Sequence, residues 1–292
     1  MYISVCSGIV THAGYATLGE GLKDLGLKAV ELRYDRDRTV ASPDKPEPSP
    51  LDSPDAIKRY EGQLATHGIR PSALLLGTDF NQADVDAEVA WVVSAVRAAQ
   101  AFGLKAIRVD SAMTGQRELP LEERVDRYAT GIRRVLQETS DSPVALGVEN
   151  HGFQGNDPNW LEMLFGKVDN PRFGMTVDTG NFYWAGHPLD RVYEIMEHLA
   201  PRCKHTHCKN IKYPPELRNQ QRELGWKYGE YVAPLYEGDI DHHRVARILK
   251  NGGYDGDLCI EDESLGHYQG AERQAVLRKD VEYFREVLKG LQ

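Results

Sequence analysis

The sequence predicts an α/β fold, a single (β/α)8 TIM barrel in which eight parallel strands alternate with eight helices. Short apolar runs and longer amphipathic segments alternate eight times along the 292 residues. Many of the short runs are apolar throughout, as expected for strands of a parallel sheet that helices cover and bury. The composition does not shift in mid-chain, and about 250 residues is typical of such a barrel. We therefore expect residues 1–292 to form one domain, and we prefer the closed barrel to an open sheet with a second domain.

The predicted strands are short runs rich in apolar and β-branched residues. A strand, a helix and another strand in succession predict a parallel pair joined by a right-handed crossover. The eight predicted strands cover residues 2–10, 28–34, 71–80, 104–111, 144–152, 173–182, 203–210 and 257–264.

The predicted helices occupy the intervals and show apolar residues at helical spacing. The first begins at Thr17 and ends near Gly26, and the second follows Ser53, whose hydroxyl can cap it. Asp239 and Asp241 begin the seventh helix, where an N-cap role explains them at least as well as catalysis does. The eight predicted helices cover residues 17–27, 54–67, 84–103, 121–139, 159–165, 189–200, 239–253 and 272–291.

Two segments interrupt the alternation. Residues 41–54 are rich in proline, which excludes a helix or an inner strand and predicts a surface loop. Residues 211–238 form an irregular insertion at the mouth of the barrel. Its aromatic side chains suit either a lid over a bound ring-shaped ligand or a subunit contact, and the sequence does not separate these two. These side chains are Tyr213, Trp226, Tyr228, Tyr231 and Tyr236.

Composition narrows the function. The net charge of −9 argues against a nucleic acid or an anionic membrane as partner, because Lys and Arg drive phosphate binding. Every apolar run falls short of the roughly 18 residues that span a bilayer, and the N-terminal run is typical of a strand and not of an export signal. The four cysteines form no CxxC pair. We expect buried thiols in a reducing compartment, and hence a cytoplasmic protein.

Four predicted strands end in side chains that can hold a metal ion: Glu149, Asp178, His207 and Glu261. Twenty-nine residues separate Glu149 from Asp178, and the same number separates Asp178 from His207. This spacing is close to the roughly 30 residues of one βαβ unit. The four side chains should therefore meet at the C-terminal mouth of the barrel, where active sites of this fold lie.

Three carboxylates and one imidazole make an oxygen-rich site. Such a set favours Mn²⁺, with Mg²⁺ or Co²⁺ as alternatives, over a structural zinc. Three negative charges in one cavity are costly without a cation. His205 lies on the same strand face as His207 but deeper, so we expect it to support the site by packing or hydrogen bonding. Glu261 is preferred to Glu263 because it directly ends the apolar run.

Five motifs resemble those of the xylose isomerase-like superfamily, within its sugar isomerase/epimerase and inosose dehydratase branch, a superfamily that also contains endonuclease IV. The resemblance follows the whole chain in the order of elements and is sharp only at the motifs. It implies a divalent-metal enzyme with those four ligands, in which the two glutamates stand on opposite faces of the substrate and move protons. Where family epimerases often carry a histidine, this chain has Asn181, which can bind a hydroxyl but cannot act as an acid or base. The motifs are ENHG (149–152), VDTGN (177–181), HTHCKN (205–210), EGDID (237–241) and IEDES (260–264).

The expected chemistry is removal of a proton beside a sugar carbonyl, with a metal-stabilised enediolate as intermediate. Glu149 and Glu261 are the candidates for proton transfer. Lys209 and His151 are candidates for stabilising the oxyanion or relaying protons; alternatively, Lys209 forms a salt bridge with a ligand and His151 caps a loop. The candidate substrate-binding residues are Asn181 and two arginines, which could instead form ordinary ion pairs: Arg33 and Arg108.

We expect a small-molecule carbohydrate substrate and, as the first hypothesis, a sugar isomerase or epimerase. The second hypothesis is a lyase that eliminates water from a keto-inositol, or a glycosidic group from a 3-oxo-sugar as in C-glycoside deglycosidases. An endonuclease IV-like repair enzyme is a remote third, because its chemistry uses a histidine-rich cluster of three metals. A barrel that has lost catalysis, or serves as one subunit of a complex, is the fourth. A homo-oligomer or a partner subunit is expected.

Overall fold

Eight parallel strands form one sheet in the computed structural model, which describes residues 1–291. Their spatial order is β12-β1-β2-β5-β6-β7-β8-β9, and a parallel bridge between Cys208 and Ile260 closes the sheet into a barrel. The Cys208 amide donates to the Cys259 carbonyl at 2.8 Å, and the Glu261 amide donates to the Cys208 carbonyl at 3.0 Å. The strands are β1 (Tyr2–Cys6), β2 (Ala29–Arg33), β5 (Arg70–Leu76), β6 (Ala106–Val109), β7 (Ala145–Glu149), β8 (Phe173–Asp178), β9 (Cys203–His207) and β12 (Asp257–Ile260).

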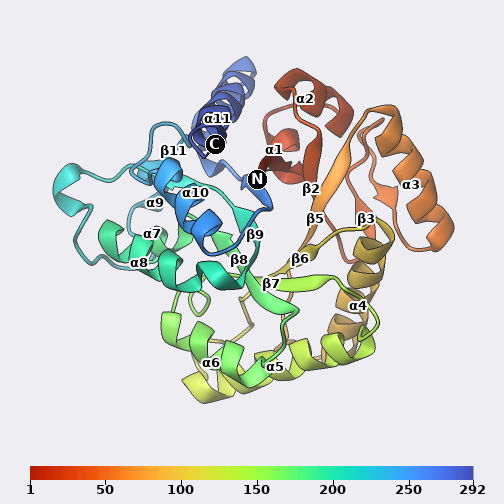
Figure 1. The fold of residues 1–292 in the computed structure, drawn as a ribbon, viewed down its shortest axis with the longest axis horizontal. Helices are drawn as coiled ribbons and strands as arrows, with labels where there is room; N and C mark the ends of the chain where they lie inside the picture. Colours follow the sequence, from red (N-terminus) through yellow and green to blue (C-terminus); the bar gives the residue numbers. More distant parts are fainter. Residues whose placement is uncertain (292) are drawn as a thin grey trace.

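Helices surround the strands (Figure 1), so the predicted (β/α)8 barrel is confirmed. The side chains of Thr17, Ser53 and Asp241 cap the helices that follow them, and such caps contribute about 1 kcal/mol each. Gly26 ends the first long helix in the left-handed conformation, with φ of 62°. The long helices are α2 (Leu18–Leu25), α3 (Pro54–Thr66), α4 (Val85–Ala101), α5 (Leu121–Glu138), α6 (Pro158–Val168), α8 (Leu189–Leu199), α10 (His242–Asn251) and α11 (Ala271–Lys289).

The strand predicted over residues 2–10 is too long. β1 ends at Cys6, and α1 (Ser7–His12) follows it at the mouth. Ile9 and Val10 are buried in this short helix, because packing against the barrel outweighs the β propensity of branched residues. Two further short helices, α7 (Asn181–Trp184) and α9 (Tyr228–Tyr231), also lie outside the predicted set.

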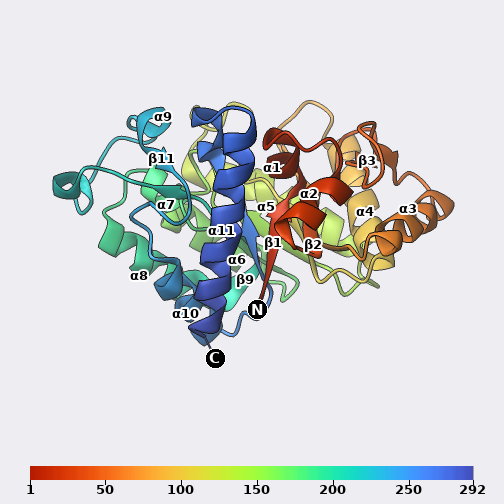
Figure 2. The same cartoon turned by 90° about the horizontal axis from the view of Figure 1, so that it is seen from above.

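The two segments that interrupt the alternation lie outside the eight-stranded sheet, as predicted, but each contains a short antiparallel strand pair. β3 (Thr39–Val40) pairs with β4 (Ser49–Pro50), and β10 (Asn210–Ile211) pairs with β11 (Val232–Ala233). In the 211–238 insertion, the rings of Trp226 and Tyr231 lie 5.9 and 5.4 Å from that of the buried Tyr213. Figure 2 shows α9 and β11 at the same end of the barrel as α1, with both chain ends at the other. The insertion is therefore a packed wall of the mouth. The division into one domain with two excursions stays a prediction.

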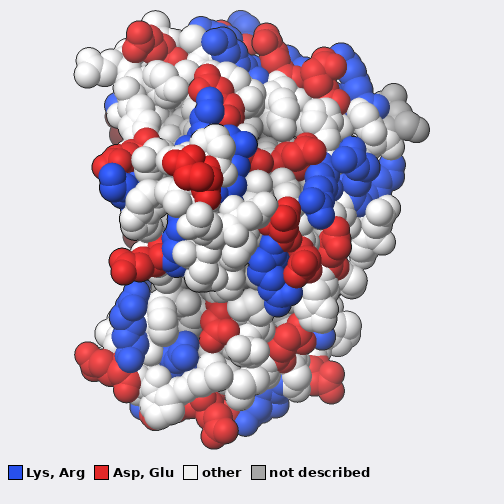
Figure 3. Space-filling model, turned by 90° about the vertical axis from the view of Figure 1, so that its left-hand side faces the viewer, with Lys and Arg blue, Asp and Glu red and all other residues white. Residues whose placement is uncertain are grey.

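The surface mixes both signs of charge. On the face shown in Figure 3, Lys and Arg side chains are interspersed with Asp and Glu. Across residues 1–291, the helices are all too short or too polar to cross a membrane.

Candidate metal centre

The four side chains predicted as ligands meet at the mouth of the barrel. Glu149, Asp178 and His207 are the last residues of β7, β8 and β9, and Glu261 directly follows β12. One ligand atom from each of the four lies within 4.8 Å of all the others. His207 Nδ1 is 2.9 Å from Glu149 Oε1 and 3.3 Å from Glu261 Oε2. The first three side chains are buried, and Glu261 is 18% exposed.

Bare carboxylate oxygens point into this cluster. Asp178 Oδ1 accepts hydrogen bonds from the amides of Gly180 and Asn181 at 2.8 and 2.7 Å. Its Oδ2 and the Oε2 of Glu261 are buried and accept no well-directed hydrogen bond, although the ammonium of Lys209 lies 3.2 and 3.1 Å from them. Unbonded buried oxygens are costly, and a hard divalent cation that prefers oxygen ligands would satisfy them. The donor set therefore fits a divalent metal ion.

Lys209, two residues beyond His207, brings positive charge to the same oxygens. Its Nζ lies 3.2 Å from Asp178 Oδ2, 3.1 Å from Glu261 Oε2 and 2.8 Å from Glu263 Oε1. Burial would lower the pKa of Lys209, but the three carboxylates hold it well above the usual value. Lys209 is therefore a permanent cation here, which agrees with the salt bridge weighed as its alternative role.

The carboxyl groups of Asp178 and Glu149 differ in their affinity for protons. Burial raises the pKa of Asp178 to about 7, and Lys209 opposes that rise. Burial would also raise the pKa of Glu149, but Arg108 and His207 hold it well below its usual value. Glu149 is consequently ionised at neutral pH, whereas Asp178 takes up a proton easily.

Arg108 lies in the wall beside Glu149. Its Nε donates to Glu149 Oε2 at 2.7 Å, and its Nη1 donates to the Leu76 carbonyl at 2.8 Å and contacts Asp110 at 3.2 Å. The guanidinium is buried and fixes the carboxylate of Glu149 in place. Contact of Arg108 with a substrate stays a prediction.

The other predicted site residues lie around the same mouth. His151 is 44% exposed, and its Nδ1 is 2.9 Å from Asp110 Oδ1; this hydrogen bond raises the pKa of His151. Asn181 is buried, and its side-chain Nδ2 has no hydrogen-bond partner. Arg33 is 69% exposed and lies 2.9 Å from Asp35. Of these three, Arg33 lines the cavity described next, and the roles of all three stay predictions.

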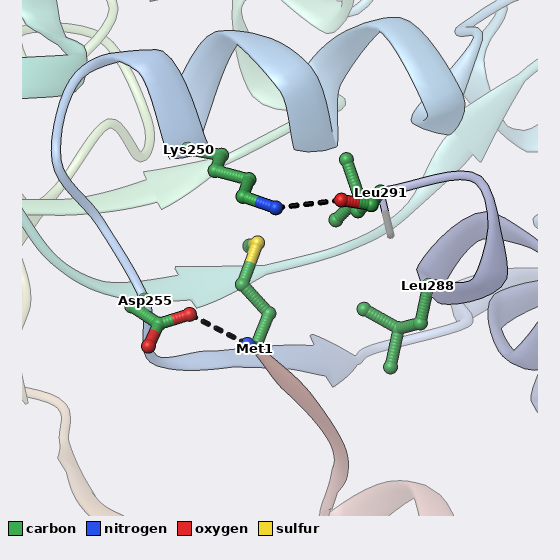
Figure 4. Close-up of a pocket in the computed structure, with 5 residues that line it drawn as sticks. All are labelled: Met1, Lys250, Asp255, Leu288 and Leu291. Carbon is green, nitrogen blue, oxygen red and sulfur yellow. Dashed lines mark hydrogen bonds and ion pairs between the residues drawn. The ribbon is translucent and has the colours of Figure 1, made fainter.

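A cavity of about 440 Å³ opens beside the cluster. It reaches from Glu261 and Glu263 across the ends of β1, β2 and β5 to Arg33 and Trp91. Its size lies within the usual range of small-molecule sites. A smaller hollow of about 340 Å³ lies at the opposite end of the barrel, where the Met1 ammonium pairs with Asp255 (Figure 4). It adjoins the chain ends and contains none of the predicted site residues.

Two residues of the site and one contact were missed from the sequence. Glu31 on β2 lies 2.9 Å from His207 Nε2, and a lone charge inside the apolar strand AVELR was the available signal. Asp110 follows β6 and supports His151. Tyr228 of the insertion donates its hydroxyl to Glu263, a contact that local sequence does not indicate. Of the two inner histidines, His205 takes the supporting position expected of it, with Nε2 2.9 Å from Glu31.

Comparison with known proteins places the chain in a family. An inosose dehydratase of Clostridium botulinum is 27% identical over 183 residues, which cover 56% of this chain and 59% of that protein. The match thus spans less than two thirds of the curated relative. An L-ribulose 3-epimerase superposes with a TM-score of 0.70 at 17% identity, over 99% of this chain and 95% of the other.

A xylose isomerase-like TIM barrel protein of Mycobacterium smegmatis, solved in complex with magnesium, has a TM-score of 0.70 at 16% identity. It covers 100% of this chain and 98% of its own. At these identities the two superpositions show the fold alone. The model of the family described as xylose isomerase-like TIM barrel matches residues 20–287. The chain therefore belongs to the xylose isomerase-like TIM barrel family, as its motifs indicated.

Proposed function

We propose that the chain is a divalent-metal-dependent sugar isomerase or epimerase. The observation that carries the proposal is the convergence of Glu149, Asp178, His207 and Glu261 within 4.8 Å beside a cavity large enough for a sugar. The match to the family model supports a carbohydrate substrate. Three carboxylates and one imidazole favour Mn²⁺, with Mg²⁺ or Co²⁺ as alternatives. The four buried, unpaired cysteines support a reducing compartment such as the cytoplasm.

The chemistry that a bound divalent cation supplies is polarisation of a carbonyl and a neighbouring hydroxyl, which makes the adjacent C–H proton removable. Glu261 lines the cavity and is the candidate base that takes this proton. Glu149, held ionised by Arg108, is the second candidate for proton transfer. Returning the proton to the opposite face of the carbon inverts it, and returning it to the neighbouring carbon isomerises the sugar.

Lys209 stands beside both carboxylates that carry bare oxygens. As a permanent cation in a buried setting, it can donate a hydrogen bond to the negative charge that develops on the sugar oxygen. Glu263 accepts a hydrogen bond from the ammonium, and Tyr228 of the insertion donates its hydroxyl to Glu263. The insertion thereby closes over the reacting groups and helps exclude water.

A lyase with the same first step is the second candidate. The raised pKa of His151 beside Asp110 makes it a half-exposed acid that can protonate a leaving hydroxyl or glycosidic oxygen. Asn181, at the position of a family histidine, offers no such proton. The similarity to a relative named inosose dehydratase supports an elimination reaction as the second candidate function.

Incubation in deuterated water with ketoses and with 3-oxo-glycosides separates the two. An epimerase or isomerase leaves deuterium on carbon in a saturated product, whereas a lyase yields an unsaturated product. Glu261→Gln should lower either activity by about 100-fold or more. Full turnover after exhaustive chelation would refute both candidates.

A further inference from the structure

Carboxylates and imidazoles alternate through the barrel interior and lead to His207. Asp257 Oδ1 lies 3.0 Å from His205 Nδ1, and His205 Nε2 lies 2.9 Å from Glu31 Oε1. The other oxygen of Glu31 lies 2.9 Å from His207 Nε2. All four side chains are at most 4% exposed. They come from β12, β9 and β2, and the series returns to β9 at His207.

The far end of this series is also fixed. Ser4 Oγ and Tyr254 Oη donate hydrogen bonds to the carboxylate of Asp257, at 2.5 and 2.9 Å. Asp257 in turn orients the ring of His205, whose second nitrogen faces Glu31. Each link is a short contact between a carboxylate and a ring nitrogen, and such charge-assisted bonds are stronger than neutral ones.

The geometry assigns each nitrogen of the His207 ring a separate task. Nε2 faces Glu31, while Nδ1 faces Glu149 and Glu261 at 2.9 and 3.3 Å. An ionised carboxylate only accepts hydrogen bonds, so Glu31 keeps a proton on Nε2. Carboxylates face Nδ1 as well, but only Nδ1 points toward the other predicted ligands. A divalent ion bound among them would therefore replace the proton on Nδ1, while Glu31 would keep the proton on Nε2.

We propose, on the basis of the proposed metal function, that Glu31 is a positioning residue that selects Nδ1 of His207 as the metal ligand, with His205 and Asp257 holding Glu31 in place. Carboxylates that support a histidine ligand in this way fix the ring and raise its basicity. Their loss typically weakens metal binding by about 10- to 100-fold.

A second metal ion at this level is the competing reading. Ligand atoms of Glu31, His205, His207 and Cys259 also lie within 4.8 Å of one another. Here, however, both oxygens of Glu31 and both nitrogens of His205 already have hydrogen-bond partners. In contrast, one oxygen each of Asp178 and Glu261 accepts no well-directed hydrogen bond and faces only cationic or ring nitrogens. Cys259 Sγ is also buried, 3.9 Å from Glu31 Oε2, which already pairs with His207. The inner group is therefore hydrogen-bonded support.

The test is calorimetric titration of the metal-free full chain with Mn²⁺, comparing Glu31→Gln with Glu88→Gln. Glu88 is a matched control because it is equally buried and accepts from the Asp79 amide at 2.7 Å and from Arg36, on α4. We expect one ion per chain, with binding weakened 10- to 100-fold by Glu31→Gln and unchanged by Glu88→Gln. Equal affinities in the parent and Glu31→Gln, equal losses in both variants, or two ions per chain would overturn the proposal.

A second measurement needs no variant and decides the matter if Glu31→Gln does not fold. In the parent loaded with diamagnetic Zn²⁺, two-bond ¹H–¹⁵N spectra should show His207 protonated at Nε2 and ligated at Nδ1. Ligation through Nε2 would overturn the assignment. Failure of the parent to bind any metal refutes the proposed function itself, whereas normal binding with an unaffected Glu31→Gln variant refutes the role of Glu31 alone.

Discussion

Replacing Lys209 with methionine removes the ammonium and keeps most of the side-chain volume. In the metal-free protein this leaves Asp178, Glu261 and Glu263 without the cation that lies 2.8 to 3.2 Å from each. Lys209 is only 4% exposed, so solvent screening does little to reduce the effect. Breaking a buried pair by removing one partner costs about 3–5 kcal/mol. Asp178 can take up a proton in response, because burial already raises its pKa to about 7, and this favours the lower end of that range.

The assay is thermal unfolding with and without Mn²⁺. An unfolding entropy of about 2.1 cal/mol/K per residue converts the loss into a fall in Tm of about 5–8 °C for a chain of 292 residues. Added Mn²⁺ should raise Tm more in Lys209→Met than in the parent, because the ion no longer enters beside a competing ammonium. Lys289→Met is the control, since it removes an exposed pair with Glu286 and should change Tm by less than about 2 °C. A metal-free Lys209→Met variant as stable as the parent would show that the ammonium does not balance these carboxylates.

Three other outcomes are expected. Mn²⁺ affinity, measured by calorimetry, should fall about tenfold for each pH unit below 7 and level off above pH 7. The reason is that the pKa of Asp178 is raised to about 7, so at lower pH the ion must displace a proton from this carboxyl group. An affinity that stays constant between pH 5.5 and 7 would contradict this. Tyr228→Phe removes the hydroxyl that contacts Glu263; it should lower kcat/KM about tenfold and change Tm by less than about 2 °C. An unchanged kcat/KM would show that Tyr228 does not contribute to the reaction. Gly131→Ala should destabilise the protein by about 1–3 kcal/mol in denaturant unfolding, because a methyl group at Gly131 would overlap the ring of Phe80; a Phe80→Leu background should recover part of the loss.

The fold was predictable because its signals are local and repeated. Each apolar run that ends in a polar residue marks one strand, and the mouth of a barrel gathers those ends whatever the helices between them do. For the same reason, the regular spacing of Glu149, Asp178 and His207 indicated that the three side chains lie at the same height along the barrel axis. Glu31 gave no comparable signal, because it lies in the first half of the chain and meets His207 only through closure of the sheet. The position of Tyr228 depends on how the aromatic rings of the insertion pack around Tyr213, which no local pattern specifies.

Arg108 pairs with Glu149, whereas Lys209 pairs with the other carboxylates of the mouth. This arrangement indicates from which side a metal ion would enter. Arg108 is buried against Glu149 and also holds the Leu76 carbonyl, so it is anchored on both sides. Lys209 makes its shortest contact, 2.8 Å, with Glu263, which lies outside the four-residue set and is 40% exposed. An ion arriving beside Asp178 and Glu261 therefore leaves Lys209 its shortest carboxylate contact. Displacing Arg108 from Glu149 would instead break that buried pair and leave the guanidinium only its longer contact with Asp110, at 3.2 Å. The open edge of the site is consequently the Asp178–Glu261 side, the side on which Glu261 and Glu263 also line the cavity.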